Sequence, residues 1–293
     1  MKIGIGSYAL FWEWHDHPRP LSIEAMVDRA RDLGCDVFEI CDDPRIEAYD
    51  ADALAALRDR AEAAGIALQL GTRGIAPAHL AAHLDIARAL GARVLRSMVQ
   101  QGDAERGAAH IVDLLAQSTA ALEAADVTLA LETYEQIPTP LLLAAIEAVD
   151  SDRIGICLDP ANVVAALELP NDVIDAAASR TVDLHVKDFA FARQEGWVGF
   201  TYSGARMGEG QLDLARELAA VYADGRSPAA IVEHWLPWQG DSATTVAMER
   251  DWTDATLAAL RASAVAVAVA DADADEQTHH PDQTPNRKQG DPQ

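Results

Sequence analysis

The sequence VTLALETYEQIPTPLLLAAIEAVDSDRIGICLDP, residues 127–160, decides the fold of this chain. It opens with a short β-rich run, continues into a segment expected to be helical over Pro138–Val149, and ends in a second β-rich run over residues 154–160. Both runs are apolar enough to be buried on two faces, as the strands of a parallel sheet are. The stretch therefore predicts a strand–helix–strand unit of an α/β protein.

The same unit recurs along the chain. Strand-like runs are expected at residues 2–8, 36–40, 66–72, 93–98, 127–134, 154–160, 181–189 and 229–235. Helices are expected between them, including a long one over residues 103–125 and a last one over residues 245–262. Units of this kind, repeated over about 260 residues, predict a closed (β/α)₈ TIM barrel rather than an open doubly wound sheet. We expect a single barrel domain over residues 1–263.

The end of the chain differs in composition from the rest. From residue 264 onward, AVAVAVADADADEQTHHPDQTPNRKQGDPQ is low in complexity and then polar. It shows no period that could bury a face against the barrel, so residues 264–293 are predicted to be a disordered tail. His279 and His280 in this tail are interpreted as solvated side chains rather than metal ligands.

Charge and cysteine content exclude several classes of function. The 47 acidic residues outweigh the 23 basic ones and give a net charge of −24. A surface this negative repels phosphate backbones and anionic lipids, so we expect no nucleic-acid and no membrane partner. The first residues lack a signal-peptide core, and Cys35, Cys41 and Cys157 are widely spaced. These features indicate a cytoplasmic protein without a disulfide framework.

Polar residues fall at the carboxyl ends of the predicted strands, where (β/α)₈ barrels carry their active sites. Glu132, Asp159, His185 and Glu233 lie at the ends of four successive strands. Taken singly, each could be a loop cap or an ion-pair partner. Together, three carboxylates and an imidazole would repel one another without a cation between them. The set predicts one divalent metal ion, Mn²⁺ or Mg²⁺ for preference, with Co²⁺ or Zn²⁺ also compatible.

Several segments resemble a known family in these same places. They are LALETYE (129–135), ICLDPAN (156–162), DLHVKD (183–188) and IVEHW (231–235), with MGEGQLD (207–213) similar to the family's glycine-bearing loop. Over residues 1–262 the chain resembles the xylose-isomerase-like TIM barrels, which include sugar isomerases, epimerases and keto-sugar dehydratases. The resemblance implies that Glu132, Asp159, His185 and Glu233 bind one metal ion. It also implies that Glu132 and Glu233 are the catalytic proton-transfer groups.

The leading prediction is an isomerase or epimerase that acts on a small keto-sugar through a metal-stabilised enediolate. The same enediolate forms when a 3-oxo sugar acid loses carbon dioxide or a keto-cyclitol loses water, so a lyase is the alternative. A DNA-repair endonuclease of similar fold is the weaker hypothesis. Thr72, Arg73, Arg96 and Ser97 at the early strand ends are poor ligands for the further metals such an enzyme needs.

Four basic residues are expected at the mouth of the barrel: Arg73, Arg96, Lys187 and Arg206. We predict that they bind an anionic substrate, a sugar acid or a sugar phosphate, because guanidinium groups pair bidentately with carboxylate and phosphate. The alternative is that they form ion pairs with nearby acids such as Asp42.

Other residues are assigned supporting roles. Glu39, Asn162 and Asp188 are candidates for holding the metal ligands in place, and Glu39 and Asp188 could equally be simple ion-pair partners. His234 directly follows Glu233, so it should point away from the barrel axis. The loop over residues 189–207 is a candidate lid or pocket wall. The aromatic residues near the first loop could wall the pocket or contact a second subunit, which leaves a homo-oligomer open.

Overall fold

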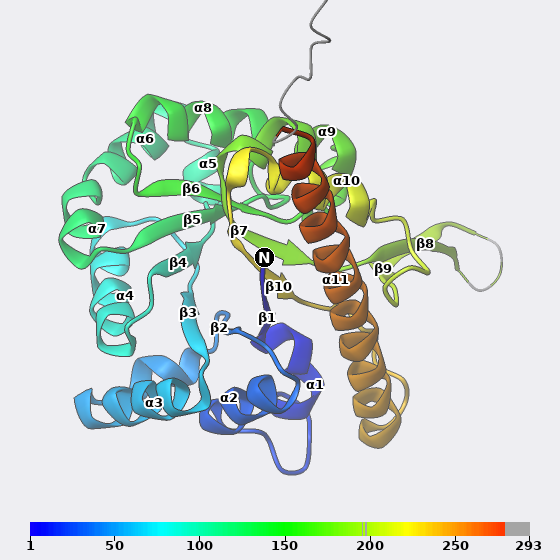
Figure 1. Ribbon diagram of the computed structural model, residues 1–293. Coiled ribbons are helices and arrows are strands. Elements are labelled where there is room, and N and C mark those ends of the chain that lie inside the picture. The colour runs from blue at the N-terminus through cyan, green and yellow to red at the C-terminus, as the bar shows by residue number, and fades with distance from the viewer. Residues whose placement is uncertain (195, 197, 279–293) are drawn as a thin grey trace, which may run out of the picture.

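The computed structural model of the chain describes residues 1–194, 196 and 198–278. At its centre is a closed barrel of parallel strands in the order β1-β10-β7-β6-β5-β4-β3-β2, surrounded by helices (Figure 1). The barrel strands are β1 Lys2–Gly6, β2 Val37–Ile40, β3 Ala67–Gly71, β4 Val94–Ser97, β5 Thr128–Glu132, β6 Ile154–Leu158, β7 Thr181–Val186 and β10 Ala229–Val232. The prediction of a TIM barrel is confirmed.

The helices that cover the barrel begin and end where local chemistry favours it. They are α1 Phe11–Trp14, α2 Ile23–Asp32, α3 Ala51–Ala64, α4 Pro77–Leu90, α8 Thr139–Val149, α9 Pro170–Ala177 and α10 Leu214–Val221. The Ser22 hydroxyl caps α2 by accepting a hydrogen bond from the Ala25 N–H. Helices α3 and α4 end at Gly65 and Gly91, whose φ angles of 73° and 71° lie in the left-handed region that glycine tolerates.

The long helix expected over residues 103–125 is divided into three. Helix α5 covers Gln101–Ala104, α6 covers Ala108–Ala116 and α7 covers Thr119–Ala125. Gly107, with a φ of 85°, is the N-cap of α6 and separates it from α5, and Ser118 lies between α6 and α7. The expectation of one helix was wrong because an apolar period of 3.6 residues continues across such breaks.

Residues 189–207, expected to form a loop, contain an antiparallel hairpin. Strand β8, Phe189–Arg193, pairs with β9, Phe200–Gly204, and the pair extends away from the barrel (Figure 1). Gly204 lets the hairpin base approach the barrel, since a Cβ there would lie 2.7 Å from the Trp235 carbonyl oxygen. Tyr202 packs edge-on against Trp235, with ring centroids 5.6 Å apart. The hairpin therefore forms a wall beside the carboxyl end of β10.

The last described element is helix α11, Ser242–Thr278. It continues past residue 263, where the sequence pattern places the end of the domain, into a stretch with alanine at every second position from 264 to 274. Alanine has the highest helix propensity, which accounts for the continuation. The remainder of the predicted tail, residues 279–293 with His279 and His280, lies outside the described residues.

The barrel interior is apolar at one end and polar at the other. Near the start of the strands, Val37, Ala229 and Ile231 form a small buried cluster, and Gly4 leaves room for it because a Cβ there would lie 2.6 Å from the Val37 carbonyl oxygen. Further along, alternate residues of β7 and its continuation, Asp183, His185 and Lys187, are all buried. The two-residue period thus places polar groups at the carboxyl end of the barrel.

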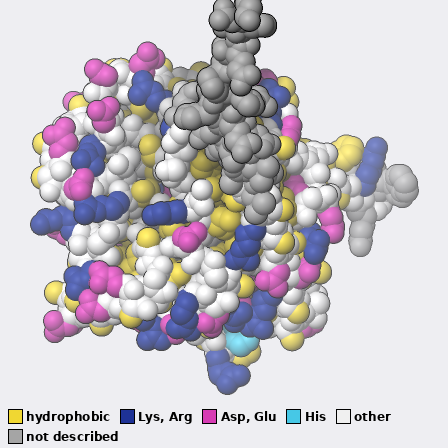
Figure 2. All heavy atoms as spheres, viewed as in Figure 1, with side chains coloured by type: hydrophobic (Ala, Val, Ile, Leu, Met, Phe, Trp, Pro, Cys, Tyr) yellow, Lys and Arg dark blue, Asp and Glu magenta, His cyan; other side chains and the backbone are white. Residues whose placement is uncertain are grey.

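The surface carries both signs of charge. Figure 2 shows basic and acidic side chains interspersed over the face in view, so the negative charge is not gathered into one patch there. No helix within the described part of the chain is both long enough and apolar enough to cross a membrane.

Candidate active site

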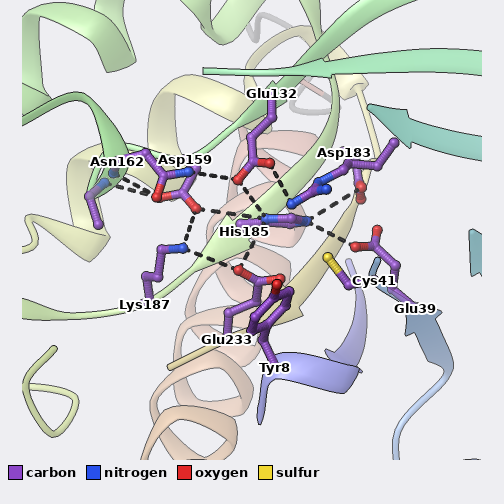
Figure 3. Close-up of polar contacts among 12 residues, drawn as sticks. Tyr8, Glu39, Cys41, Glu132, Asp159, Asn162, Asp183, His185, Lys187 and Glu233 are labelled. Carbon is purple, nitrogen blue, oxygen red and sulfur yellow. Dashed lines mark hydrogen bonds and ion pairs between the residues drawn. The ribbon is translucent and has the colours of Figure 1, made fainter. Parts of the chain in front are cut away.

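Strands β5, β6, β7 and β10 bring the four predicted metal ligands together (Figure 3). Glu132 ends β5, Asp159 follows β6, His185 lies in β7 and Glu233 follows β10. One ligand atom from each of the four lies within 4.8 Å of the other three, and all four side chains are buried. Four residues that span about a hundred positions of sequence therefore share one point near the barrel axis.

The imidazole of His185 lies at the centre of this group. Its Nδ1 is 3.4 Å from Glu233 Oε2, 3.5 Å from Glu132 Oε1 and 3.7 Å from Asp159 Oδ2. Among the described residues, Nδ1 has no hydrogen-bond partner. A buried ring nitrogen that faces three carboxylates without a hydrogen bond is the arrangement that a divalent cation completes. The donor set of three carboxylates and one imidazole therefore fits the predicted metal ion.

The other ring nitrogen of His185 faces a second pair of acids. Nε2 lies 3.2 Å from Glu39 Oε1 and 3.9 Å from Asp183 Oδ2. An Nε2–H donated to Glu39 leaves the lone pair of Nδ1 free for a metal, as is usual for metal-binding histidines. This contact suits the supporting role predicted for Glu39. The sequence pattern did not single out Asp183, although its place two residues before His185 puts it on the same face of β7.

Two buried cations balance the acids. Lys187 Nζ lies 2.7 Å from Asp159 Oδ2 and 3.1 Å from Glu233 Oε2. Arg96 Nη2 lies 2.6 Å from Glu132 Oε2. Both basic residues, predicted to bind substrate, are thus also ion-pair partners of the metal ligands.

The same contacts move the pKa values of Glu132 and Glu233 in opposite directions. Burial alone would raise the pKa of Glu233, but His185 and Lys187 outweigh burial and hold that pKa well below its ordinary value. For Glu132, burial outweighs Arg96 and the pKa is raised. A divalent ion bound by both carboxylates would lower both pKa values.

A cavity of about 310 Å³ borders two of the four candidate ligands, Glu132 and Glu233. Its lining includes Tyr8, Arg73, Arg96, Glu132, Lys187, Tyr202, Glu233 and Trp235. Gly6, at the end of β1, leaves room for the Glu233 carboxylate, because a Cβ there would lie 3.3 Å from Glu233 Oε1. The cavity is large enough for a small sugar acid, and both predicted catalytic glutamates line it.

The predicted cationic rim is only partly assembled. Arg73, half exposed, donates to Asp42 Oδ2 at 2.8 Å and to the Tyr8 hydroxyl at 2.7 Å, and it lines the cavity. Arg206 does not line the cavity; it donates to Asp251 Oδ2 on α11 at 2.7 Å. The hairpin β8–β9 precedes Arg206 and carries the chain away from the axis, a course that the sequence pattern could not reveal.

The remaining predicted residues have separate roles around the candidate site. Asn162 donates from Nδ2 to Glu132 Oε1 at 2.6 Å, which holds the glutamate. Asp188 accepts hydrogen bonds from the backbone N–H groups of Gly208, Gly210 and Leu212, so it orders the glycine-bearing loop instead of touching the ligands. His234 is buried against Trp252 and points outward as expected.

The model of the xylose isomerase-like TIM barrel family matches residues 27–262. The chain belongs to this family. The resemblance inferred from the strand-end segments is therefore confirmed, and the chain belongs to an enzyme family.

Named relatives include both a lyase and an epimerase. The 3-oxo-isoapionate decarboxylase of Pectobacterium atrosepticum is 46% identical over 258 residues, which cover 88% of this chain and 94% of that protein. A D-psicose 3-epimerase crystallised in the presence of D-fructose superposes with a TM-score of 0.68 at 15% identity, covering 89% of this chain and 98% of the epimerase. The IOLI protein with a bound zinc atom gives a TM-score of 0.68 at 16% identity, covering 86% and 96%. The two solved structures establish the shared fold alone.

Proposed function

We propose that this protein is a metal-dependent lyase that decarboxylates a 3-oxo sugar acid. The observation that carries the proposal is the 46% identity to 3-oxo-isoapionate decarboxylase along nearly the whole of both chains. The leading prediction from sequence was isomerisation or epimerisation, with the lyase as the alternative. The comparisons favour the lyase, because the epimerase that superposes on the barrel shares only 15% of its residues with this chain.

Decarboxylation needs a group that stabilises the electron pair left behind by carbon dioxide and a group that supplies a proton. Loss of carbon dioxide from a 3-oxo acid breaks the bond to the carboxylate carbon, and its electron pair moves toward the neighbouring ketone. When bound by Glu132, Asp159, His185 and Glu233, a divalent ion supplies positive charge that stabilises negative charge on a substrate oxygen. A proton must then be delivered to the carbon that lost the carboxylate.

Residues that line the cavity can meet these needs. The ammonium group of Lys187 faces the cavity, and although burial alone would lower its pKa, Asp159 and Glu233 raise it, so the group is protonated at neutral pH. Lys187 can therefore donate a hydrogen bond or a proton to the substrate. Glu132, a candidate metal ligand in the same cavity, is the other group that can take part in proton transfer. Arg73 is the cavity cation with the most exposed side chain and is suited to hold the substrate's carboxylate.

Epimerisation is the second candidate, because Glu132 and Glu233 both line the cavity and two such groups can remove and return a proton. Incubation of the purified chain with a panel of 3-oxo sugar acids and free ketoses in deuterated water separates the two. The lyase releases carbon dioxide and gives a product with deuterium at the new C–H bond. Exchange of substrate C–H for deuterium without release of carbon dioxide would instead establish the epimerase. Arg206→Ala, outside the cavity, is the matched control for Arg73→Ala in either assay.

A further inference from the structure

Away from the four ligands near the barrel axis, helix α4 carries two histidines on one face. His79 and His83 are four residues apart, which places their side chains next to each other, with ring centroids 4.3 Å apart. Both Nε2 atoms face the Thr72 hydroxyl oxygen, at 2.8 Å and 3.0 Å. The carboxyl end of β3 and the first turns of α4 thus bring two imidazole nitrogens to one point.

His83 is oriented as a metal ligand would be. Its Nδ1 lies 3.0 Å from the carbonyl oxygen of His79, which can only accept, so Nδ1 carries the hydrogen of the neutral ring. The lone pair then lies on Nε2. A backbone carbonyl that fixes the other ring nitrogen is the usual support of a metal-binding histidine.

A carboxylate lies next to the His83 ring. Glu47 Oε1 lies 3.5 Å from His83 Nε2, and the glutamate side chain is largely exposed and free to reorient. The other acids in the same cavity of about 340 Å³ are already paired, Asp42 with Arg73 and Asp43 with Arg45. The Thr72 hydroxyl has a single hydrogen and can donate it to only one of the two Nε2 atoms.

We propose that His79, His83 and Glu47 form a second metal site, which takes a borderline transition ion such as Zn²⁺, Ni²⁺ or Cu²⁺. Two imidazole nitrogens and one carboxylate suit these ions better than Mg²⁺ or Mn²⁺, which prefer oxygen ligands. The open side of the cavity leaves positions for water or a further ligand. Asp42 and Arg73 line both this cavity and the one at the active site, so an ion here adjoins the substrate rim.

Zinc binding tests the site without any reference to turnover. The full chain with His279→Ala and His280→Ala, which removes the histidines of the predicted tail, serves as the parent. After removal of metal, equilibrium dialysis should give two zinc ions per parent chain. His79→Ala/His83→Ala should lose one of them, and His185→Ala should lose the other.

Glu47→Gln changes an exposed side chain, so it reports on the site even if replacing the buried His83 destabilises the barrel. It should weaken one of the two zinc equivalents about 10-fold, a typical effect of removing a metal contact. If the His79→Ala/His83→Ala variant is folded and binds zinc as the parent does, the proposal is overturned. Unchanged zinc titrations in Glu47→Gln and in a folded single variant, His79→Ala, would overturn it equally. A chain that fails to decarboxylate any substrate leaves these titrations unaffected.

Discussion

Replacing Lys187 by methionine is expected to tighten metal binding while it slows turnover. Lys187 Nζ contacts Asp159 Oδ2 and Glu233 Oε2, the same oxygens that face His185 Nδ1. The ammonium group therefore holds two carboxylate oxygens that a metal ion would use. Methionine is unbranched, of similar length and uncharged, and its thioether can pack on the Trp235 ring in place of the cation–π contact of Nζ, which lies 4.4 Å from the ring centroid.

The magnitudes follow from these contacts. Lys187 Nζ donates a hydrogen bond to Glu233 Oε2 and forms an ion pair with Asp159 Oδ2, and metal binding to the wild type must weaken both contacts. A hydrogen bond to a charged group contributes ~1.5–3 kcal/mol. If the free energy of metal binding becomes more favourable by ~1.4–2.8 kcal/mol in the variant, the dissociation constant of the metal falls ~10- to 100-fold. Loss of a positioned proton donor lowers kcat ~10²- to 10⁴-fold. The two effects have opposite signs, which a general loss of structure would not produce.

Calorimetric titration of metal into the metal-free protein measures the first effect, and carbon dioxide release at saturating metal measures the second. Lys187→Arg keeps the charge and is the control: it should keep the wild-type metal affinity more nearly than methionine does. Weaker metal binding in Lys187→Met would refute the view that the lysine competes for the ligand oxygens. An unchanged kcat at saturating metal would refute its role at the substrate.

Three further changes test other parts of the structure. Arg73→Ala should raise KM for an anionic substrate ~10-fold or more, because a charged hydrogen bond is lost; a KM as unaffected as that of Arg206→Ala would contradict this. Burial raises the pKa of Glu249 to about 8, so this group costs stability as the pH rises from 4.5 through 8. Glu249→Gln can still accept the hydrogen bond from the Trp12 N–H, and its free energy of unfolding should exceed that of the wild type by roughly 3–5 kcal/mol above pH 8 and be equal to it at pH 4. Chemical denaturation at the two pH values measures this, and an equal gain at both would argue against it. Gly210→Ala should destabilise the loop, since a Cβ there would collide with Asp188 Oδ1 and the Phe189 carbonyl oxygen; an unchanged melting temperature and kcat would show that the loop adapts.

The barrel and the clustering of the four candidate metal ligands were predictable from sequence for one physical reason. A strand of a parallel barrel is apolar until its carboxyl end, so a charged residue such as Glu132 or Glu233 marks that end without any knowledge of the fold's contacts. The outward direction of His234 followed from the two-residue period of a strand. Asp183 could have been found by the same period and was missed because it lies inside an apolar run.

Contacts between distant elements could not be predicted in this way. Arg206 directly precedes the glycine-bearing segment 207–213 in sequence, yet the hairpin β8–β9 directs it to Asp251 on α11. Lys187 and Arg96 were predicted to bind an anionic substrate; both line the cavity, and both also form ion pairs with the candidate metal ligands, because buried carboxylates need a cation as partner. The choice between isomerase and lyase depended on a relative rather than on any single residue of the site.

The dependence of carbon dioxide release on a metal ion at the four ligands tests the central claim most directly. Wild type stripped of metal by a chelator, and then titrated with Mn²⁺ or another divalent ion, should release no carbon dioxide from a 3-oxo sugar acid until metal is restored. His185→Ala should stay inactive at the metal concentration that restores the wild type. Full release of carbon dioxide by the metal-free chain, or by a folded His185→Ala variant, would contradict the account.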